Sequence, residues 1–309
     1  MFIFFGGIMK KVAIVADNSG YLTPDEVKKY GVAKILPISF VVNGEEYYEN
    51  INMSYEEFYQ FLKDKKAEVS TSQPSIEMVK EGWREILKEY DEIIYILLSS
   101  GLSGACNSAI NASHDEEFEV RVFVANNQRV SFSNKFAILE ARKMIEEGKS
   151  ASEIKDYLEK SKADSGIYIA VDTLKYLKKG GRVTPAAAAI GTLLNIKPIL
   201  QIHGGKLDAY AKTMSMKQAK NKMISAMKKE IEERFPEALS QGKINISIAH
   251  TFEDVNAQEI KDFTQEMKKE FEGVKFFVCD PLPLFIACHT GPGAIGVGYV
   301  VDNLGVLEN

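Results

Sequence analysis

Hydroxyl groups, glycines, one arginine and one histidine are concentrated in four short motifs of this sequence. Two of them, Thr71 to Ser75 (T-S-Q-P-S) and Ser99 to Gly104 (S-S-G-L-S-G), are expected to be loops that each open a helix. The third ends in Gly180-Gly181-Arg182, and the fourth begins at His289 (H-T-G-P-G). Hydroxyls, amide N–H groups at helix starts, a guanidinium and an imidazole can all donate hydrogen bonds to an anion. Together the motifs predict a binding site for an anionic head group.

The first motif is partly explained by helix capping. Ser75 is a suitable N-cap for a helix that begins at Ile76, and Pro74 stiffens the entry to that helix. Capping leaves Thr71 and Ser72 unexplained, and their adjacent hydroxyls can donate to an anion near the helix start. A plain cap is the more common role for such a loop, so Thr71 and Ser72 are evidence for an anion site only in combination with the other motifs.

The second motif follows an almost entirely apolar strand and leads into small residues typical of a helix. In an open α/β sheet, ligands bind beyond the carboxyl ends of the strands. Ser103 and Gly104 are therefore placed where an anion would dock, although a plain strand-to-helix turn with capping serines is an equal alternative on local evidence.

Arg182 and His289 complete the candidate site. Gly180 and Gly181 suit a left-handed helix exit, which leaves Arg182 on a rigid turn from which its guanidinium can bind a carboxylate or phosphate. A surface salt bridge is the ordinary alternative for a single arginine. His289 is interpreted either as a polar contact at the head group or as a hydrogen-bonded core histidine.

Catalytic and nucleotide-binding motifs are weak by comparison. A triad of Ser103, His289 and either Asp17 or Asp172 can be imagined, but Ser103 lacks the G-x-S-x-G elbow, and Asp17 more commonly accepts from amides of its own turn. The glycines up to Gly296 form a formal G-x-G-x-x-G, yet too few residues follow for a dinucleotide-binding unit, and no P-loop is present. We therefore predict binding rather than catalysis, with no catalytic residue, no metal ligand and no cofactor.

The composition is that of a soluble globular protein, with 45% hydrophobic and 26% charged residues among 309. The net charge of −5 is spread over interspersed acids and bases, so nucleic-acid binding is not expected. The three cysteines lack zinc or disulfide spacing, which favours a reducing cytoplasm. Residues 1–9 are apolar but too short to span a bilayer, so we expect a cytoplasmic protein that is not integral to the membrane, with its natural start at Met9.

The hydrophobic pattern predicts an α/β protein of two domains. In residues 10–164, short β-branched runs at 12–16, 35–42, 93–98 and 120–125 alternate with amphipathic segments, and S-x-x-E capping boxes at Ser54 and Ser150 mark two helix starts. This alternation predicts a mostly parallel sheet with helices on both faces.

Residues 165–309 form the second predicted domain, and residues 1–9 are expected to lie outside the fold. A strand at 167–171 is followed by strands at 196–202 and 206–211, which flank a tight turn at His203-Gly204-Gly205. Long helices are expected from Ser215 and from about Asp254. This half is therefore predicted to contain a mixed sheet.

Taken together, the motifs resemble the DegV family, which includes the fatty-acid-binding subunits of bacterial fatty acid kinase. From about Val12 to Val300 they follow the family order: D-x-S, T-S-Q-P-S, S-x-L-S-G, L-x-Y-L-x-x-G-G-R and H-x-G-P-G. The resemblance implies two α/β domains, the first of three α/β/α layers, with a long-chain fatty acid bound between them. It implies that Thr71 and Ser103 hold the carboxylate, with Arg182 and His289 near the head group. Ser72 and Gly104 belong to the same two loops and complete the predicted binding residues.

The family presents the fatty acid to a separate kinase that makes acyl-phosphate, so this chain is expected to have no ATP site of its own. Members usually carry threonine where Ala105 stands and Asp-Ser where Asn126-Asn127 stand, and many kinase-linked members have an arginine where Met214 stands. We expect these differences to affect partner recognition more than fatty-acid binding. The alternative function is a serine hydrolase that acts on a lipid ester through Ser103 and His289.

Overall fold

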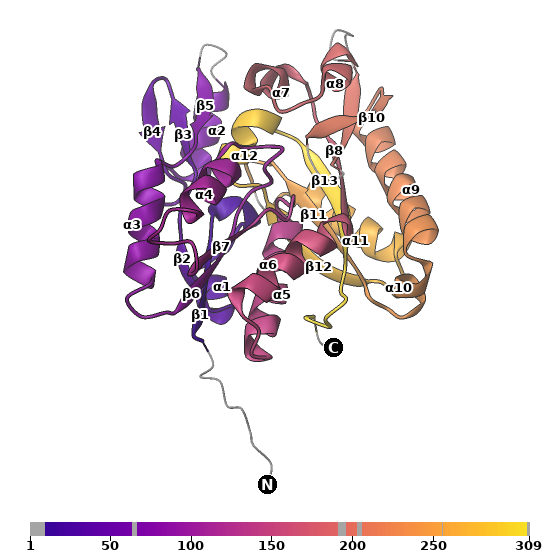
Figure 1. The fold of residues 1–309 in the computed structure, drawn as a ribbon. Helices are drawn as coiled ribbons and strands as arrows, with labels where there is room; N and C mark the ends of the chain where they lie inside the picture. The colour runs from indigo at the N-terminus through magenta and orange to yellow at the C-terminus, as the bar shows by residue number, and fades with distance from the viewer. Residues whose placement is uncertain (1–9, 64–66, 191–195, 203–205, 255, 308–309) are drawn as a thin grey trace.

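The computed structural model describes residues 10–63, 67–190, 196–202, 206–254 and 256–307. Two main sheets lie side by side, each covered by helices, and a smaller sheet adjoins the first (Figure 1). Within the described residues, no helix combines the length and the apolar character needed to cross a membrane.

The first main sheet is built from strands that the β-branched runs predict. Its order is β2-β1-β6-β7 and all its neighbouring strands are parallel. The strands are β1 (Val12–Ala16), β2 (Val32–Ile35), β6 (Glu92–Ile96) and β7 (Val122–Ala125). The helices of this half are α1 (Pro24–Lys29), α2 (Tyr55–Lys63), α3 (Ile76–Ile86), α4 (Ala105–Ser113), α5 (Phe132–Glu146) and α6 (Ala151–Lys160), with short 3₁₀ turns η1 (Asn18–Gly20) and η2 (Ser161–Ala163).

The helices cover both faces of this sheet. On one face, Trp83 of α3 packs edge-on against Tyr95 of β6, with ring centroids 5.8 Å apart. On the other face lie α5 and α6, and α6 begins with the predicted capping box between Ser150 and Glu153. The α/β fold with a parallel N-terminal sheet is therefore confirmed.

A three-stranded antiparallel sheet, which the pattern does not predict, adjoins the first. It has the order β4-β3-β5, with β3 (Ser39–Val42), β4 (Glu45–Tyr47) and β5 (Val69–Ser72). The run at 35–42, expected as one strand, is divided between β2 and β3 because Pro37 has no N–H to continue a ladder. The amide of Ile38 bonds instead to the side chain of Asn18 at 2.9 Å. Thr71 and Ser72, expected in a loop, end strand β5.

The second main sheet is mixed, as predicted. Its order is β10-β9-β8-β13-β11-β12, and only the pair β11 and β12 is parallel. The strands are β8 (Ser165–Ala170), β9 (Lys197–Ile202), β10 (Leu207–Thr213), β11 (Ile244–His250), β12 (Lys275–Pro281) and β13 (Ile295–Val301). The helices are α7 (Lys175–Gly180), α8 (Pro185–Ile190), α9 (Met216–Arg234), α10 (Pro236–Ser240), α11 (Gln258–Glu270) and α12 (Leu284–Thr290).

Two details of this half differ from the sequence pattern or lie outside it. The helix expected from about Asp254 begins at Gln258. The turn expected at His203-Gly204-Gly205 lies outside the described residues, although β9 and β10 on its two sides do pair antiparallel.

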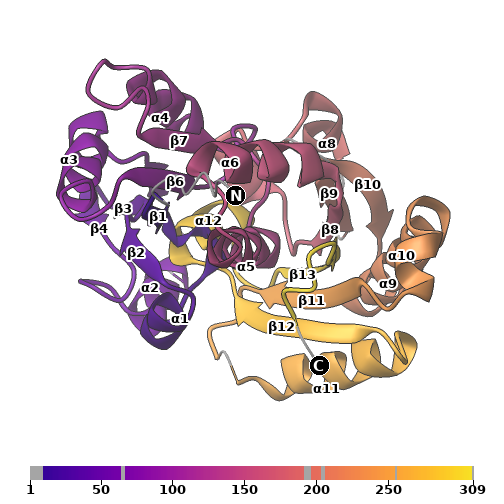
Figure 2. The same cartoon turned by 60° about the horizontal axis from the view of Figure 1, so that its bottom comes forward.

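Helices α5 and α12 join the two main sheets. Figure 2 shows α5 between the N-terminal strands and the C-terminal sheet, and α5 packs against β1, β6, β11 and β13. Its fully buried Lys135 bridges both halves, with Nζ 2.9 Å from Glu26 Oε1 and 2.6 Å from Asp280 Oδ2. The start of α12 is fixed from the other half, because Leu284 N donates to Glu49 Oε2 at 2.8 Å.

Candidate functional site

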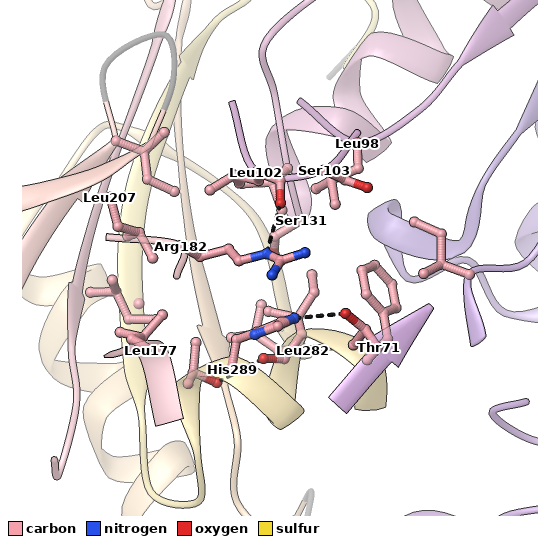
Figure 3. Close-up of a pocket in the computed structure, with 18 of the residues that line it drawn as sticks. Thr71, Leu98, Leu102, Ser103, Ser131, Leu177, Arg182, Leu207, Leu282 and His289 are labelled. Atoms are coloured by element: carbon pink, nitrogen blue, oxygen red, sulfur yellow. Dashed lines mark hydrogen bonds between the residues drawn. The ribbon is translucent and has the colours of Figure 1, made fainter. Parts of the chain in front are cut away.

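A cavity of about 340 Å³ lies between the two main sheets, beside α12 (Figure 3). All six residues predicted to bind the ligand line it: Thr71, Ser72, Ser103, Gly104, Arg182 and His289. Most of the remaining lining is apolar: Ile38, Leu98, Leu102, Val130, Phe132, Ile167, Ile169, Leu177, Ile202, Leu207, Ala249, Leu282, Phe285 and Ile286. Polar groups from four motifs and a largely hydrocarbon wall therefore share one space.

Thr71 and His289 form the central polar contact. The Oγ1 atom of Thr71, at the end of β5, lies 2.9 Å from Nε2 of His289 on α12 (Figure 3). Burial, together with the positive charge of Arg182, lowers the pKa of His289 to about 4, so the imidazole is neutral at pH 7. In the tautomer with hydrogen on Nε2, His289 donates to Thr71, which leaves the threonine hydroxyl free to donate to a ligand.

Gly180 makes room for this histidine. A Cβ at position 180 would lie 2.2 Å from His289 Nδ1, which is closer than real atoms approach. The glycine at the end of α7 therefore allows α7 and α12 to meet, in addition to the left-handed exit that Gly181 makes with φ of 66°. The sequence pattern explained only the exit.

Arg182 is fixed by backbone oxygens on both sides. Its Nε donates to the Leu102 carbonyl at 3.2 Å, and its Nη1 donates to the Gly180 carbonyl. The described residues provide no hydrogen-bond partner for Nη2. Figure 3 shows the guanidinium in the cavity, facing the His289 ring. It is therefore held in place with one donor group left for an anion.

The loop of Ser103 faces the Thr71 motif. The amide of Ala105 donates to Ser103 Oγ at 3.2 Å, and Gly104 precedes α4 without a side-chain cap. A Cβ at Gly104 would lie 3.0 Å from Gln73 Oε1, so the two hydroxyl-bearing motifs are in close approach. The Ser103 hydroxyl can accept from Ala105 and still donate its own hydrogen to a ligand.

Two local predictions for polar side chains are confirmed. Ser75 caps α3, because Met78 N donates to its Oγ at 3.2 Å. Asp17 accepts from the amide of Ser19 in its own turn at 2.9 Å, and it also accepts from the amide of Leu98, just after β6, at 2.7 Å. Asp17 thus fixes the segment that leads from β6 into the Ser103 loop.

The pH dependence of stability is expected to report on this buried carboxyl. Burial raises the pKa of Asp17 from 3.8 to about 6, although hydrogen bonds from Ser19 and Leu98 oppose the shift. The folded protein therefore holds the Asp17 proton more tightly than the unfolded chain does. The contribution of Asp17 to the free energy of unfolding is complete below pH 3.8, the ordinary pKa of the carboxyl, and it is lost as the pH rises through about 6. We expect Asp17→Asn to remove this loss, so that its free energy of unfolding falls less over this range than that of the wild type. Urea unfolding at a series of pH values measures the difference, and equal pH slopes would contradict it.

Several lining residues carry no sequence signal of their own. Ser131 adopts a φ of 58°, which is unusual for a residue with a side chain, and directs Phe132 toward the cavity. The apolar residues of β8, β11 and β13 line it only because of strand register. Gly296 is the last glycine of the G-x-G-x-x-G that does not form a dinucleotide-binding motif, and it lines the cavity wall.

A second, smaller cavity of about 140 Å³ touches the same polar group. It shares Thr71, Arg182 and His289 with the main cavity, and the exposed Lys179 lines it. The polar end of the main cavity therefore lies next to a smaller cavity that is lined by one exposed lysine.

Comparison with known proteins shows one consistent similarity. The family model described as "Uncharacterised protein, DegV family" matches residues 11–302. A DegV domain-containing protein of Halalkalibacterium halodurans is 31% identical over 300 residues, covering 95% of this chain and 100% of the relative. A solved DegV family protein from Thermus thermophilus, whose structure was reported for its fatty acid binding, is 29% identical with a TM-score of 0.83, covering 94% of this chain and 99% of the other. The fatty acid binding protein DegV of Bacillus subtilis is 28% identical with a TM-score of 0.78, with the same coverage of both chains.

Proposed function

Because the chain belongs to the DegV family, we propose that its cavity binds one long-chain fatty acid. The carboxylate lies among Thr71, Ser103 and Arg182, and the acyl chain lies along the apolar wall. The observation that carries this proposal is the gathering of all the predicted polar residues at one cavity whose remaining lining is mostly apolar. The likeness to fatty-acid-binding DegV proteins of Thermus thermophilus and Bacillus subtilis supports the same ligand.

The acyl chain supplies most of the affinity. Burial of a methylene contributes about 0.8 kcal/mol, so a chain of about 15 methylenes gives up to roughly 12 kcal/mol before the costs of association. The polar groups orient the ligand and select a carboxylate. Arg182 supplies the positive charge, because His289 is neutral at pH 7. His289 instead orients the Thr71 hydroxyl through the hydrogen bond between them.

Removal of one head-group hydroxyl should weaken binding only moderately. A hydrogen bond to a charged group contributes about 1.5–3 kcal/mol and water replaces part of it, so we expect Ser103→Ala to cost about 1–2 kcal/mol, or roughly 5- to 30-fold in Kd. Isothermal titration calorimetry with oleate measures the change in Kd. Ser108→Ala on α4 is the matched control, because Ser108 does not line the cavity. Complete loss of binding by a folded Ser103→Ala protein would contradict the view that the acyl chain, and not the head group, supplies most of the affinity.

The proposal includes a partner. We infer from the resemblance to the DegV family that the bound carboxylate is presented to a separate fatty acid kinase for acyl-phosphate formation. The small cavity with the exposed Lys179 lies next to the proposed carboxylate site, where such a partner would approach. Met214, where many kinase-linked relatives carry arginine, is 67% exposed between β10 and α9. Equal acyl-phosphate yield from Met214→Arg and wild type with a kinase would show that this position does not control coupling.

The serine hydrolase remains the alternative prediction. The bond of His289 Nε2 to Thr71, and the pairing of Asp17 with Ser19 and Leu98, support binding over catalysis by a triad. Covalent labelling of Ser103 by a fluorophosphonate would favour the hydrolase.

A further inference from the structure

Two glycines of β13 shape the sheet face that walls the cavity. Gly296 lies between Ile169 of β8 and Ala249 of β11, and Gly298 lies between Ile167 and Ser247 in the row two residues further along. Residues two apart on a strand point to the same face, so both glycines face the side from which Ile167 and Ile169 line the cavity.

The space above these two glycines differs. A Cβ at Gly296 would have no neighbour closer than the Ala249 carbonyl oxygen at 3.6 Å, so the space there is open cavity. A Cβ at Gly298 would lie 2.5 Å from Cζ of Phe132, and 2.2 Å from the Gly166 carbonyl oxygen. The tip of the Phe132 ring therefore occupies the position that a side chain at 298 would take.

The backbone of Phe132 is held firmly in this position. Phe132 is the first residue of α5, is 1% exposed and lines the cavity. It follows Ser131, whose φ of 58° is maintained by a bond from its amide to the Ser19 carbonyl at 3.0 Å. One turn later, Lys135 ties α5 to both halves of the molecule through Glu26 and Asp280. The ring is thus a fixed part of the cavity wall.

We propose that Phe132, seated on Gly298, determines which acyl chains this cavity accepts. The ring fills space that would otherwise extend the cavity over the second glycine row, and so it excludes chains too long or too bulky for the remaining volume. This inference rests on the proposed fatty-acid binding and adds a specificity-determining residue to it. A smaller side chain at 132 opens space continuous with the cavity, and the preferred ligand becomes longer.

Affinities for a series of saturated fatty acids test this. Myristate, palmitate, stearate and arachidate are titrated into wild type and Phe132→Leu, and the ratio of arachidate to myristate affinity is compared. We expect the ratio to rise by roughly tenfold or more in Phe132→Leu, since each additional buried methylene contributes about fourfold. Phe136→Leu is the control. Phe136 is also a buried phenylalanine of α5, but it packs on Phe277 with centroids 5.6 Å apart and does not line the cavity.

The outcomes separate this inference from the proposed function. An unchanged ratio in a folded Phe132→Leu protein, or the same change in Phe136→Leu, would overturn the role of Phe132 while fatty-acid binding stands. A wild type that binds none of the four acids would overturn the proposed function itself. If Phe132→Leu fails to fold, Phe132→Met takes its place, because it also removes the ring from its position over Gly298 while it leaves a longer, flexible apolar side chain. Its ratio must then rise for the proposal to stand.

Discussion

Replacement of Gly296 by leucine is expected to weaken fatty-acid binding strongly while the protein stays folded. A Cβ at this position meets only ordinary contacts of 3.6 Å or more, and its neighbours across the strands, Ile169 and Ala249, line the same cavity. A leucine side chain therefore extends into the space proposed for the acyl chain. Because the tail supplies most of the affinity, we expect Kd for oleate to rise roughly 100-fold or more.

The matched control is Gly296→Ala, whose single methyl group leaves most of the cavity open. We expect its Kd to stay within about threefold of the wild type, since a Cβ there is in normal van der Waals contact. Thermal unfolding without ligand should show that the leucine variant is at least as stable as wild type, because its side chain fills an apolar cavity. Tight oleate binding by a folded Gly296→Leu protein would place the acyl chain elsewhere.

The largest loss of stability is expected for Arg129→Met. Arg129 and Glu140 are almost fully buried, with Nη1 2.5 Å from Oε2, and Arg129 Nη2 also donates to the Ser161 carbonyl at 2.9 Å. Burial raises the pKa of Glu140, and the Arg129 charge opposes that increase. Loss of the arginine leaves a buried carboxylate without its partner charge, so the free energy of unfolding should fall by about 3–5 kcal/mol.

Urea unfolding of Arg129→Met measures this loss, with the double variant Arg129→Met/Glu140→Gln as control. The double variant removes the isolated charge while Tyr157 can still donate to position 140, so it should recover part of the stability. A loss below about 1 kcal/mol in the single variant would mean that the pair contributes no more than a surface ion pair.

The same hydrogen-bond network includes Asn127. Asn127 is fully buried, accepts from Arg129 N at 3.0 Å and donates to Asn134 at 2.9 Å, and Asn134 in turn donates to Ser19 at 2.8 Å. This chain of bonds connects the end of β7 to the start of α5, where Ser131 and Phe132 enter the cavity wall. Asn127 therefore has a structural role close to the site.

The polar half of the site could be predicted from the sequence because its residues follow from local rules. Thr71 and Ser103 lie in loop-like motifs next to predicted strands and helices, and Arg182 follows a recognisable helix exit. Ser103 follows β6 at the carboxyl edge of the parallel sheet, where ligands bind in such folds. Thr71 ends β5 of the antiparallel sheet, so this rule alone does not place it beside Ser103. The resemblance of the motifs to one family then implied that they meet at one carboxylate site.

The apolar half could not be predicted in the same way. Ile169, Ala249 and Gly296 line the cavity because β8, β11 and β13 pair in a register that depends on contacts far apart in the chain. The position of Phe132 depends on the positive φ of Ser131, for which a serine gives no signal. The extra sheet was missed because the run around Pro37 looks like one strand until its hydrogen bonds are known.

Native mass spectrometry of the purified protein, followed by extraction and identification of any released lipid, tests the central claim most directly. Bound fatty acid at one molecule per chain, retained through purification or gained after incubation with myristate, palmitate, stearate or oleate, is the expected result. A mass that stays that of the chain alone after incubation with each of these acids would contradict fatty-acid binding by this cavity.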